Sequence, residues 1–452
     1  MRGDFSRLTF RPDRHFTAVL FQQGRVQLDA DANEEAAIQL ALARTMAADV
    51  IGQHGGPADG FEVTFVPRTE SGDPATLRIQ RGRYYVDGVL ADSTAPAPER
   101  PVTGEAPPPA GDLTYWDQPF AYLDPELESD ALPGTFPFLV YLRVHEQLVT
   151  AVEDPGIRES ALGPALPDTA VRTRVVWQVR AVDLGRTEDP SSAFQAWVER
   201  SRAHAFLAAR TERPARVEDD PCIVAPDAAF RGEENQLYRV EIHQGGDAGT
   251  ATFKWSRDNG SVTFPIEAIG GAWVTLGSLG RDDRLGLHVG DWTEVSDDAS
   301  AARGETGPLL RVEEIDVVGR RVRLSDEPAA GVGRIASRHP LLRRWDQRRQ
   351  TKRGAPELRD GAVRVVEGAW LDLEDGVQVW FDGKGTYRGG DYWLIPARTL
   401  EADVEWPRSA AGEPLLEPPA GVDVHYAPLA WVTGAGSEDT QSLRHQFRPL
   451  TG

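Results

Sequence analysis

Apolar and polar residues alternate in short segments along most of the chain, and glycine or proline separates these segments. A period of two turns one side of a segment towards a core and the other towards solvent, so the pattern predicts β-strands. Arg83–Leu90 contains a turn signal at Asp87-Gly88 and is expected to form a hairpin with Thr76–Ile79. Other predicted strands are Phe61–Val66, Phe136–Glu146, Arg172–Val182, Tyr238–Gln244, Ala251–Ser256, Ser261–Ile266, Trp273–Leu276, Val363–Val366, Trp370–Leu373, Val377–Phe381 and Asp391–Pro396. We therefore expect a mainly β fold.

Two segments follow a helical period instead. The first lies near residues 31–51, begins with acidic residues, and carries an apolar stripe at every fourth position, formed by Ile38, Leu42, Met46 and Val50. The second lies near residues 191–210 and places four residues on one face, namely Phe194, Trp197, Val198 and Ala205. These two helices are the expected exceptions in a β-rich chain.

The length and the proline distribution predict a multidomain chain. At about 150 residues per domain, 452 residues suggest two or three domains. A proline-rich stretch at 93–112 predicts a linker between an N-terminal region, 1–92, and a central β-rich region, 113–335. The remainder, 336–452, is predicted to be a C-terminal β-rich domain. The domains are expected to be sandwich- or barrel-like, and a small barrel is suggested by Asp291–Ser296, Leu309–Val318 and Arg320–Leu324.

The charge balance narrows the possible partners. The chain has 49 Lys and Arg residues against 70 Asp and Glu residues, a formal net charge of −21, which argues against a general nucleic-acid or membrane binder. One segment, 338–353, reverses this sign. It is either a solvated linker or a dock for an acidic surface, for which the candidates are Arg338, Arg343, Arg344, Arg348, Arg349, Lys352 and Arg353.

The sequence shows no set of residues with the spacing of a catalytic, cofactor or metal site. Cys222 is the single cysteine, the nine histidines are scattered, and no nucleophile or phosphate-loop motif occurs. Acid pairs such as Asp282-Asp283 and Asp297-Asp298 are the only support for a glycan-hydrolysing enzyme or a toxin, and solvated turns explain them better. The twelve tryptophans either fill cores and interfaces or form a stacking platform for sugars. We expect no enzymatic activity and no cofactor.

The first residues predict an arm that packs on a neighbouring domain or on another subunit. This part of the chain precedes the first helix and has too little chain around it to bury its apolar side chains, which are Phe5, Phe10, Phe16, Leu20 and Phe21. The sequence has no signal peptide and no apolar run long enough to cross a membrane. We expect cytoplasmic synthesis without a cleaved signal and no membrane insertion.

Several strings of residues resemble a bacterial family of unknown molecular function that is associated with phage tail-like contractile injection systems. They run from the start of the chain to about residue 430 and include Met1–Arg7, Leu20–Glu34, Arg81–Gly88, Thr150–Pro155, Thr173–Arg180, Asn235–His243, Thr252–Val262, Gly390–Arg398 and His425–Ala430.

The resemblance implies a structural component of such a particle, in the baseplate, spike or tail-fibre region. It further implies homo-oligomers, trimeric or hexameric, that contact other particle subunits, and incorporation into a particle that can leave the cell. A carbohydrate- or receptor-binding module on the same particle is the alternative. Nucleic acid is not an expected partner.

Overall fold

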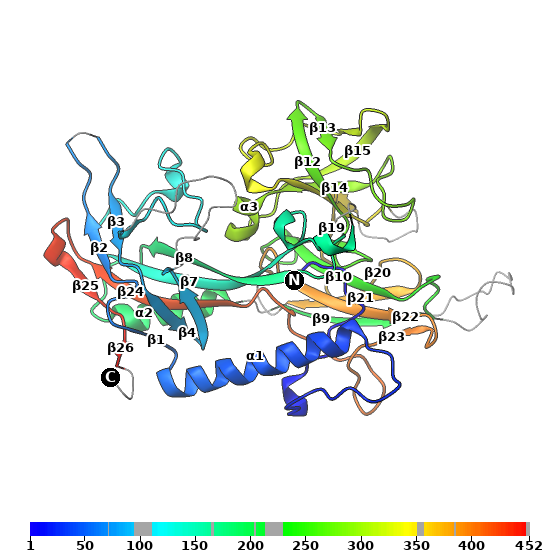
Figure 1. Ribbon diagram of the computed structural model, residues 1–452, viewed down its shortest axis with the longest axis horizontal. Helices are drawn as coiled ribbons and strands as arrows, with labels where there is room; N and C mark the ends of the chain where they lie inside the picture. The colour runs from blue at the N-terminus through cyan, green and yellow to red at the C-terminus, as the bar shows by residue number, and fades with distance from the viewer. Residues whose placement is uncertain are drawn as a thin grey trace, which may run out of the picture.

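The computed structural model describes residues 1–70, 72–94, 111–163, 167–202, 205–212, 229–349, 357–383 and 386–448. As predicted, the fold is mainly β. The strands of the described part form five open sheets and one closed barrel (Figure 1). The described α-helices are α1 (Asp29–Ile51), α2 (Pro190–Ser201) and α3 (Asp298–Arg303), and the short 3-10 helices are Pro12–Arg14, Glu128–Asp130, Pro155–Ile157, Ser160–Leu162, Ala336–Arg338 and Ser437–Asp439.

Both ends of the chain build the first core. One sheet has the order β26 (Gln446–Phe447), β1 (His54–Pro57), β4 (Arg83–Val86), β5 (Val89–Asp92), and a second has β2 (Val63–Val66), β3 (Thr76–Ile79), β6 (Leu113–Thr114). A third has β25 (Thr440–Ser442), β24 (Val424–Val432), β7 (Phe138–Val149), β8 (Arg172–Val182). Along β7, Val140 and Leu142 face this core, whereas Leu139 and Tyr141 pack with Phe194 of α2. The strand is apolar on both faces because both faces are covered.

Two facing sheets form a central sandwich with its own core. The larger sheet has the order β18 (Leu358–Arg359), β19 (Ala362–Arg364), β11 (Thr252–Ser256), β10 (Gln236–Gln244), β22 (Tyr392–Arg398), β23 (Asp403–Val404). The smaller has β20 (Trp370–Asp372), β21 (Val377–Gly383), β9 (Ala205–Thr211). Aromatic side chains from both sheets meet between them, including Phe253, Phe381 and Trp393.

The predicted small barrel is confirmed. It closes in the order β12 (Thr263–Gly270), β13 (Trp273–Leu276), β16 (Arg321–Leu324), β15 (Leu309–Asp316), β14 (Trp292–Ser296), β17 (Leu341–Trp345). Alternate side chains fill its interior, among them Phe264, Val274, Val322 and Leu342. Closure leaves no unpaired strand edge in the barrel.

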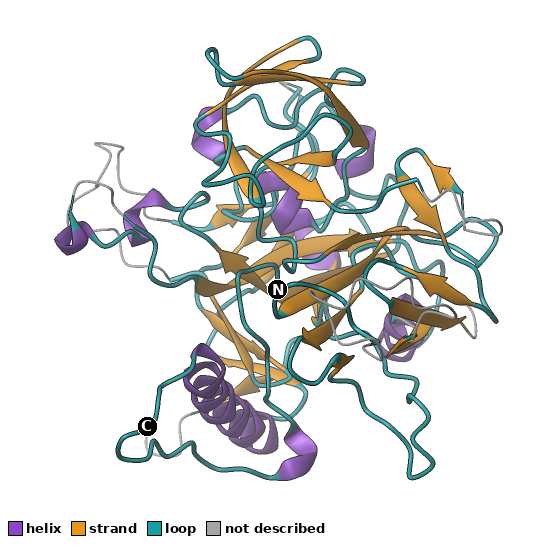
Figure 2. Cartoon of the chain, turned by 90° about the vertical axis from the view of Figure 1, so that its right-hand side faces the viewer, coloured by secondary structure: helices purple, strands orange, loops and turns teal. Residues whose placement is uncertain are grey.

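The helix α1 ends at the predicted residue, Ile51, and begins two residues before the predicted start, and it lies along the outside of the first core (Figure 1). It contacts β1 and β4, and the turn between β4 and β5 approaches it closely. A Cβ placed on Gly88 would lie 2.2 Å from the carbonyl oxygen of Arg44 in α1. In both views α1 and the barrel occupy opposite ends of the molecule (Figure 2). Among the described helices, α1 included, none combines the length and the apolar character needed to span a bilayer.

Three predictions about the architecture need correction. The helix predicted near 191–210 ends at Ser201, because residues from Ala205 to Thr211 pair with β21 as strand β9. The hairpin predicted between Thr76–Ile79 and Arg83–Leu90 does not form, since β3 pairs with β2 and β6 whereas β4 pairs with β1 and β5.

The sheets also cross the predicted domain boundaries. The boundary at 335/336 falls inside the barrel, because β17 closes it, and β24 near the C-terminus pairs with β7. Most of the predicted linker 93–112 lies outside the described residues.

Candidate functional site

The first three residues of the predicted arm are anchored in the molecule. Arg2 Nη2 lies 2.5 Å from Glu241 Oε1, and Asn259 Nδ2 donates to the carbonyl oxygen of Gly3 at 2.9 Å. The amino group of Met1 donates to the hydroxyl of Tyr392. The first three residues of the arm therefore pack against the central sandwich of the same chain.

The next part of the arm lies against the first half of α1. Ser6 Oγ donates to Asp29 at 2.6 Å, the amide of Val19 donates to Glu35 at 2.5 Å, and the Gln39 amide donates to the carbonyl oxygen of Thr17 at 3.3 Å. Ile38, on the same part of the helix, is buried. The acidic residues that open α1 thus hold the arm in place as well as meeting the positive end of the helix dipole.

Beyond these contacts, large apolar side chains of the arm and of α1 face solvent. We call this set the arm–helix surface. The exposed fractions are 53% for Phe16, 84% for Leu20, 51% for Phe21, 82% for Val26, 48% for Leu28, 49% for Leu42, 66% for Met46 and 72% for Val50. Phe5 and Phe10, predicted for the same role, are half-buried in the chain itself and do not belong to it.

The orientation of α1 explains this exposure. The face that packs on the protein carries small residues, since Ala30 is buried and Ala37, Ala41 and Ala48 are half-buried. Of the predicted stripe, Ile38 is buried against the protein, whereas Leu42, Met46 and Val50 point outwards. A helix on a protein surface ordinarily buries its large apolar residues and exposes its small or polar ones. In α1 this order is reversed for the second half of the helix, where Leu42, Met46 and Val50 are exposed.

The basic segment does not form the predicted surface patch. Arg343 and Arg344 are 6% and 4% exposed, because β17 closes the barrel and also contacts β11 of the central sandwich. Arg338 stacks on Tyr122 at 5.3 Å. Arg348 and Arg349 remain exposed, whereas Lys352 and Arg353 lie outside the described residues.

A cluster of buried charges joins the barrel to the central sandwich. Glu241 and Lys254 of the sandwich are fully buried, and Lys254 Nζ lies 3.4 Å from Glu241 and 2.6 Å from Glu294 of the barrel. Burial acts to raise the pKa of Glu241, but the charges of Arg2, Arg239 and Lys254 outweigh it and hold that pKa well below its ordinary value. The sequence analysis predicted both strands but gave no signal for this cluster, which forms only where the barrel packs on the sandwich.

The residues that supported an enzyme or a sugar platform have structural partners. Asp297 caps α3 through the amides of Ala299 and Ser300, and Asp298 contacts His339 at 2.9 Å. All twelve tryptophans lie within the described residues, and each is buried or half-buried. In the described part of the chain, no group of three His, Cys, Asp or Glu residues is arranged to hold a metal ion. Among the described residues, the arm–helix surface thus gathers large apolar side chains that the chain itself leaves exposed.

Comparison with known proteins gives a family but no function. No curated protein and no solved structure matches the chain. The model of a family of unknown function, DUF6519, matches residues 1–211 and 195–446. Since these matches cover nearly the whole sequence, the chain belongs to that family.

Proposed function

We propose that this chain is a non-enzymatic structural subunit of a phage tail-like contractile injection particle, in its baseplate, spike or tail-fibre region. It acts through contacts with copies of itself and with other subunits, and the arm–helix surface is one of these contacts. The observation that carries the proposal is the orientation of α1, whose large residues Leu42, Met46 and Val50 face away from the chain.

Exposed apolar groups of this size favour association. Covering a Leu or Met side chain contributes about 1.5–3 kcal/mol, and exposed apolar patches that combine several such residues mark interaction sites. The anchored start of the arm and the hydrogen bonds that Asp29 and Glu35 accept from it hold the segment in place before a partner arrives. A partner therefore gains apolar burial without first ordering the arm.

The tryptophans do not single out a carbohydrate site, because each of them is buried or half-buried in the described residues. A glycan site built from other residues stays a separate hypothesis. Binding of the intact oligomer to a glycan array tests it directly.

Oligomeric state tests the role of the surface. Purified chain is examined by sedimentation velocity as wild type and as the Leu42→Asp/Met46→Asp variant. We expect a wild-type oligomer and a folded, monomeric double variant. Val318→Asp, at a turn of the barrel where Val318 is 97% exposed, is the matched control and keeps the wild-type state. If both variants form the wild-type oligomer to the same extent, the arm–helix surface is not part of the interface.

Particle composition tests the class of assembly. Cells that carry the gene with its neighbours express the tagged chain, and sheared particles are isolated by density gradient and analysed by mass spectrometry. We expect the wild type and Val318→Asp to co-sediment with the particle and the double variant to be depleted from it. A chain that never co-sediments, and that is monomeric when purified, would contradict the proposed function.

A further inference from the structure

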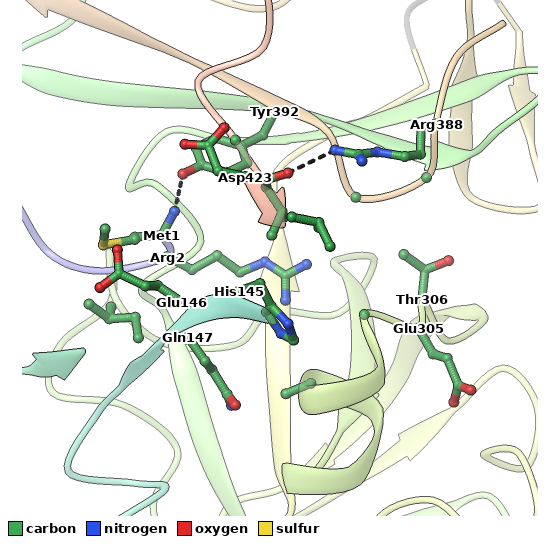
Figure 3. Close-up of a pocket in the computed structure, with 18 of the residues that line it drawn as sticks. Met1, Arg2, His145, Glu146, Gln147, Glu305, Thr306, Arg388, Tyr392 and Asp423 are labelled. Atoms are coloured by element: carbon green, nitrogen blue, oxygen red, sulfur yellow. Dashed lines mark hydrogen bonds between the residues drawn. The ribbon is translucent and has the colours of Figure 1, made fainter. Parts of the chain in front are cut away.

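A pocket of about 390 Å³ lies where the first core, the central sandwich and the barrel meet (Figure 3). β7 supplies one wall through His145, Glu146 and Gln147, and the residues that precede β22 and β24 supply another through Arg388 and Asp423. Residues after α3, including Thr306, form the far side. The volume lies in the range of small-molecule sites, which form preferentially at junctions between domains.

Two arginines of the pocket differ from the others. Arg2 and Arg239 pair with Glu241, Arg44 pairs with Glu146 at 2.8 Å, and Arg388 pairs with Asp391. Among the described residues, no carboxylate oxygen lies within ion-pair distance of either Arg143 or Arg343.

The partners of these two arginines are neutral. Arg343 is 6% exposed, and its Nη1 donates to the carbonyl oxygen of Gly260, while its buried Nε has no partner in the described part of the chain. Arg143 Nη1 lies 3.1 Å from Gln178 Oε1, 3.4 Å from the carbonyl oxygen of Ala302 and 3.2 Å from His145 Nδ1. Burial lowers the pKa of both arginines, that of Arg343 to about 10 with the charge of Arg2 adding to the effect. Guanidinium groups keep their charge in proteins at neutral pH.

Two carboxylates of the pocket, Glu305 and Glu153, bond to other groups, and the charges of Glu153, Glu241 and Glu294 act on Arg343 without forming an ion pair among the described residues. Glu305 lies 2.6 Å from Arg303, and Glu153 accepts hydrogen bonds from the amide and hydroxyl of Thr150 at 2.8 and 2.9 Å. The charge of Asp423 acts on the amino group of Met1, whose pKa it raises against the larger lowering by burial. His145 adds no charge, because burial, Arg143 and His425 lower its pKa to about 3.

We propose that this pocket binds a small oxyanion, a carboxylate or phosphate group, with Arg143 and Arg343 as its counter-charges. A buried cation without an anionic partner is costly, and guanidinium forms its strongest hydrogen bonds with these oxyanions. The proposal is independent of the proposed assembly role, since the arm–helix surface lies on other residues.

Isothermal titration of the full-length chain tests the site. Sodium phosphate and sodium citrate are titrated separately at constant ionic strength, so that the two arms distinguish a phosphate ligand from a carboxylate ligand. We expect saturable binding of one probe at a single site. Absence of saturable binding for both probes in the wild type would overturn the proposal.

Three variants locate the binding. Arg143→Gln removes the charge and is expected to weaken binding about tenfold or more, because a hydrogen bond to a charged group contributes about 1.5–3 kcal/mol. Arg143→Lys retains the charge and is expected to recover part of the loss. Arg348→Gln, at a surface arginine whose side chain is 70% exposed, is the matched control and binds as the wild type does. Near-ultraviolet circular dichroism verifies each fold, and a folded Arg143→Gln variant with wild-type affinity would contradict the assignment.

Discussion

The barrel and α1 differ in where their large apolar side chains lie. In the barrel, large side chains such as Phe264 and Leu342 point inwards, and the exposed Val318 stands at a turn. In α1, the buried Ala30 faces the protein, whereas Met46 and Val50 face solvent. The same kind of periodic pattern thus marks an internal core in one region and an uncovered surface in the other. Periodicity reports that a face requires burial, and it does not report which molecule provides it.

The largest effect is expected in the barrel. Phe264→Ala removes a side chain that is 1% exposed and leaves a cavity, so we expect a loss of about 3–5 kcal/mol in the free energy of unfolding. Urea denaturation, with hydrogen exchange to locate the change in the barrel, measures it. Val318→Ala is the control and changes stability little. Equal effects from both would contradict the closed, self-contained core.

Gly88 tests how closely α1 packs on the first core. Its φ is +78°, and a Cβ would lie 2.2 Å from the Arg44 carbonyl oxygen. Gly88→Ala therefore adds a backbone clash to about 1–3 kcal/mol of conformational strain. Gly412→Ala separates the two terms, because Gly412 has φ +85° and open space around it. Thermal unfolding is expected to rank Gly88→Ala well below Gly412→Ala, and the reverse order would refute the close approach.

Ala30 tests which face of α1 is internal. Ala30→Leu inserts volume at a position that is 1% exposed, and overpacking of this kind costs about 1–3 kcal/mol. Val50→Leu adds a single methylene at an exposed position and is expected to be neutral. Chemical denaturation compares the two variants. If Val50→Leu alone were destabilising, the face of α1 that carries Val50, and not the face that carries Ala30, would be the internal one.

Acid is expected to weaken the sheet beneath α1. Burial and the neighbouring His445 lower the pKa of His54 in β1 to about 4. Between pH 6.5 and 4 the unfolded chain binds a proton at this position and the folded chain does not, so stability falls as the pH falls. His54→Gln is expected to reduce that fall by of the order of 1–2 kcal/mol. The free energy of unfolding is measured between pH 6.5 and 4 for the wild type, for His54→Gln and for the control His15→Gln, at an exposed histidine. Parallel pH profiles for all three proteins would argue against a buried neutral His54.

The smallest effect is expected at the outward face of α1. Met46→Ala changes a side chain that is 66% exposed, so the stability of the dilute chain is expected to change by less than about 0.5 kcal/mol. Denaturation at low protein concentration measures this without association. A loss of several times that size would show that Met46 packs within its own chain and would break the contrast with the barrel.

Local signals predicted individual elements well. Trp273–Leu276 and Arg172–Val182 are strands with the predicted ends, and Asp87-Gly88 forms the turn between β4 and β5. The strands follow from the alternation of apolar and polar residues. The turn follows from Gly88, because a glycine has no Cβ and adopts the left-handed backbone that this turn requires. Prediction failed at 205–211, since an alanine-rich segment with helical spacing becomes β9 once β21 pairs with it.

The local sequence pattern did not predict which distant strands pair or how the cores pack together. The arginines at 343 and 344 have the composition of a surface patch, yet they are buried because β17 is covered on both sides. The pocket that contains Arg143 and Arg343 draws its walls from β7, β17 and the loop before β22. No local pattern places these segments together, because they are far apart in the chain and meet only where the three cores pack against one another.

The sequence alone determined the β-rich class, the extent of α1, the small barrel and the apolar character of the arm, since each depends on neighbouring residues and a short period. The tertiary structure decided which face of α1 remains uncovered, which arginines lose their carboxylate partners, and which distant strands share a sheet. Those outcomes depend on packing between segments far apart in the chain, whose free energy no local window contains.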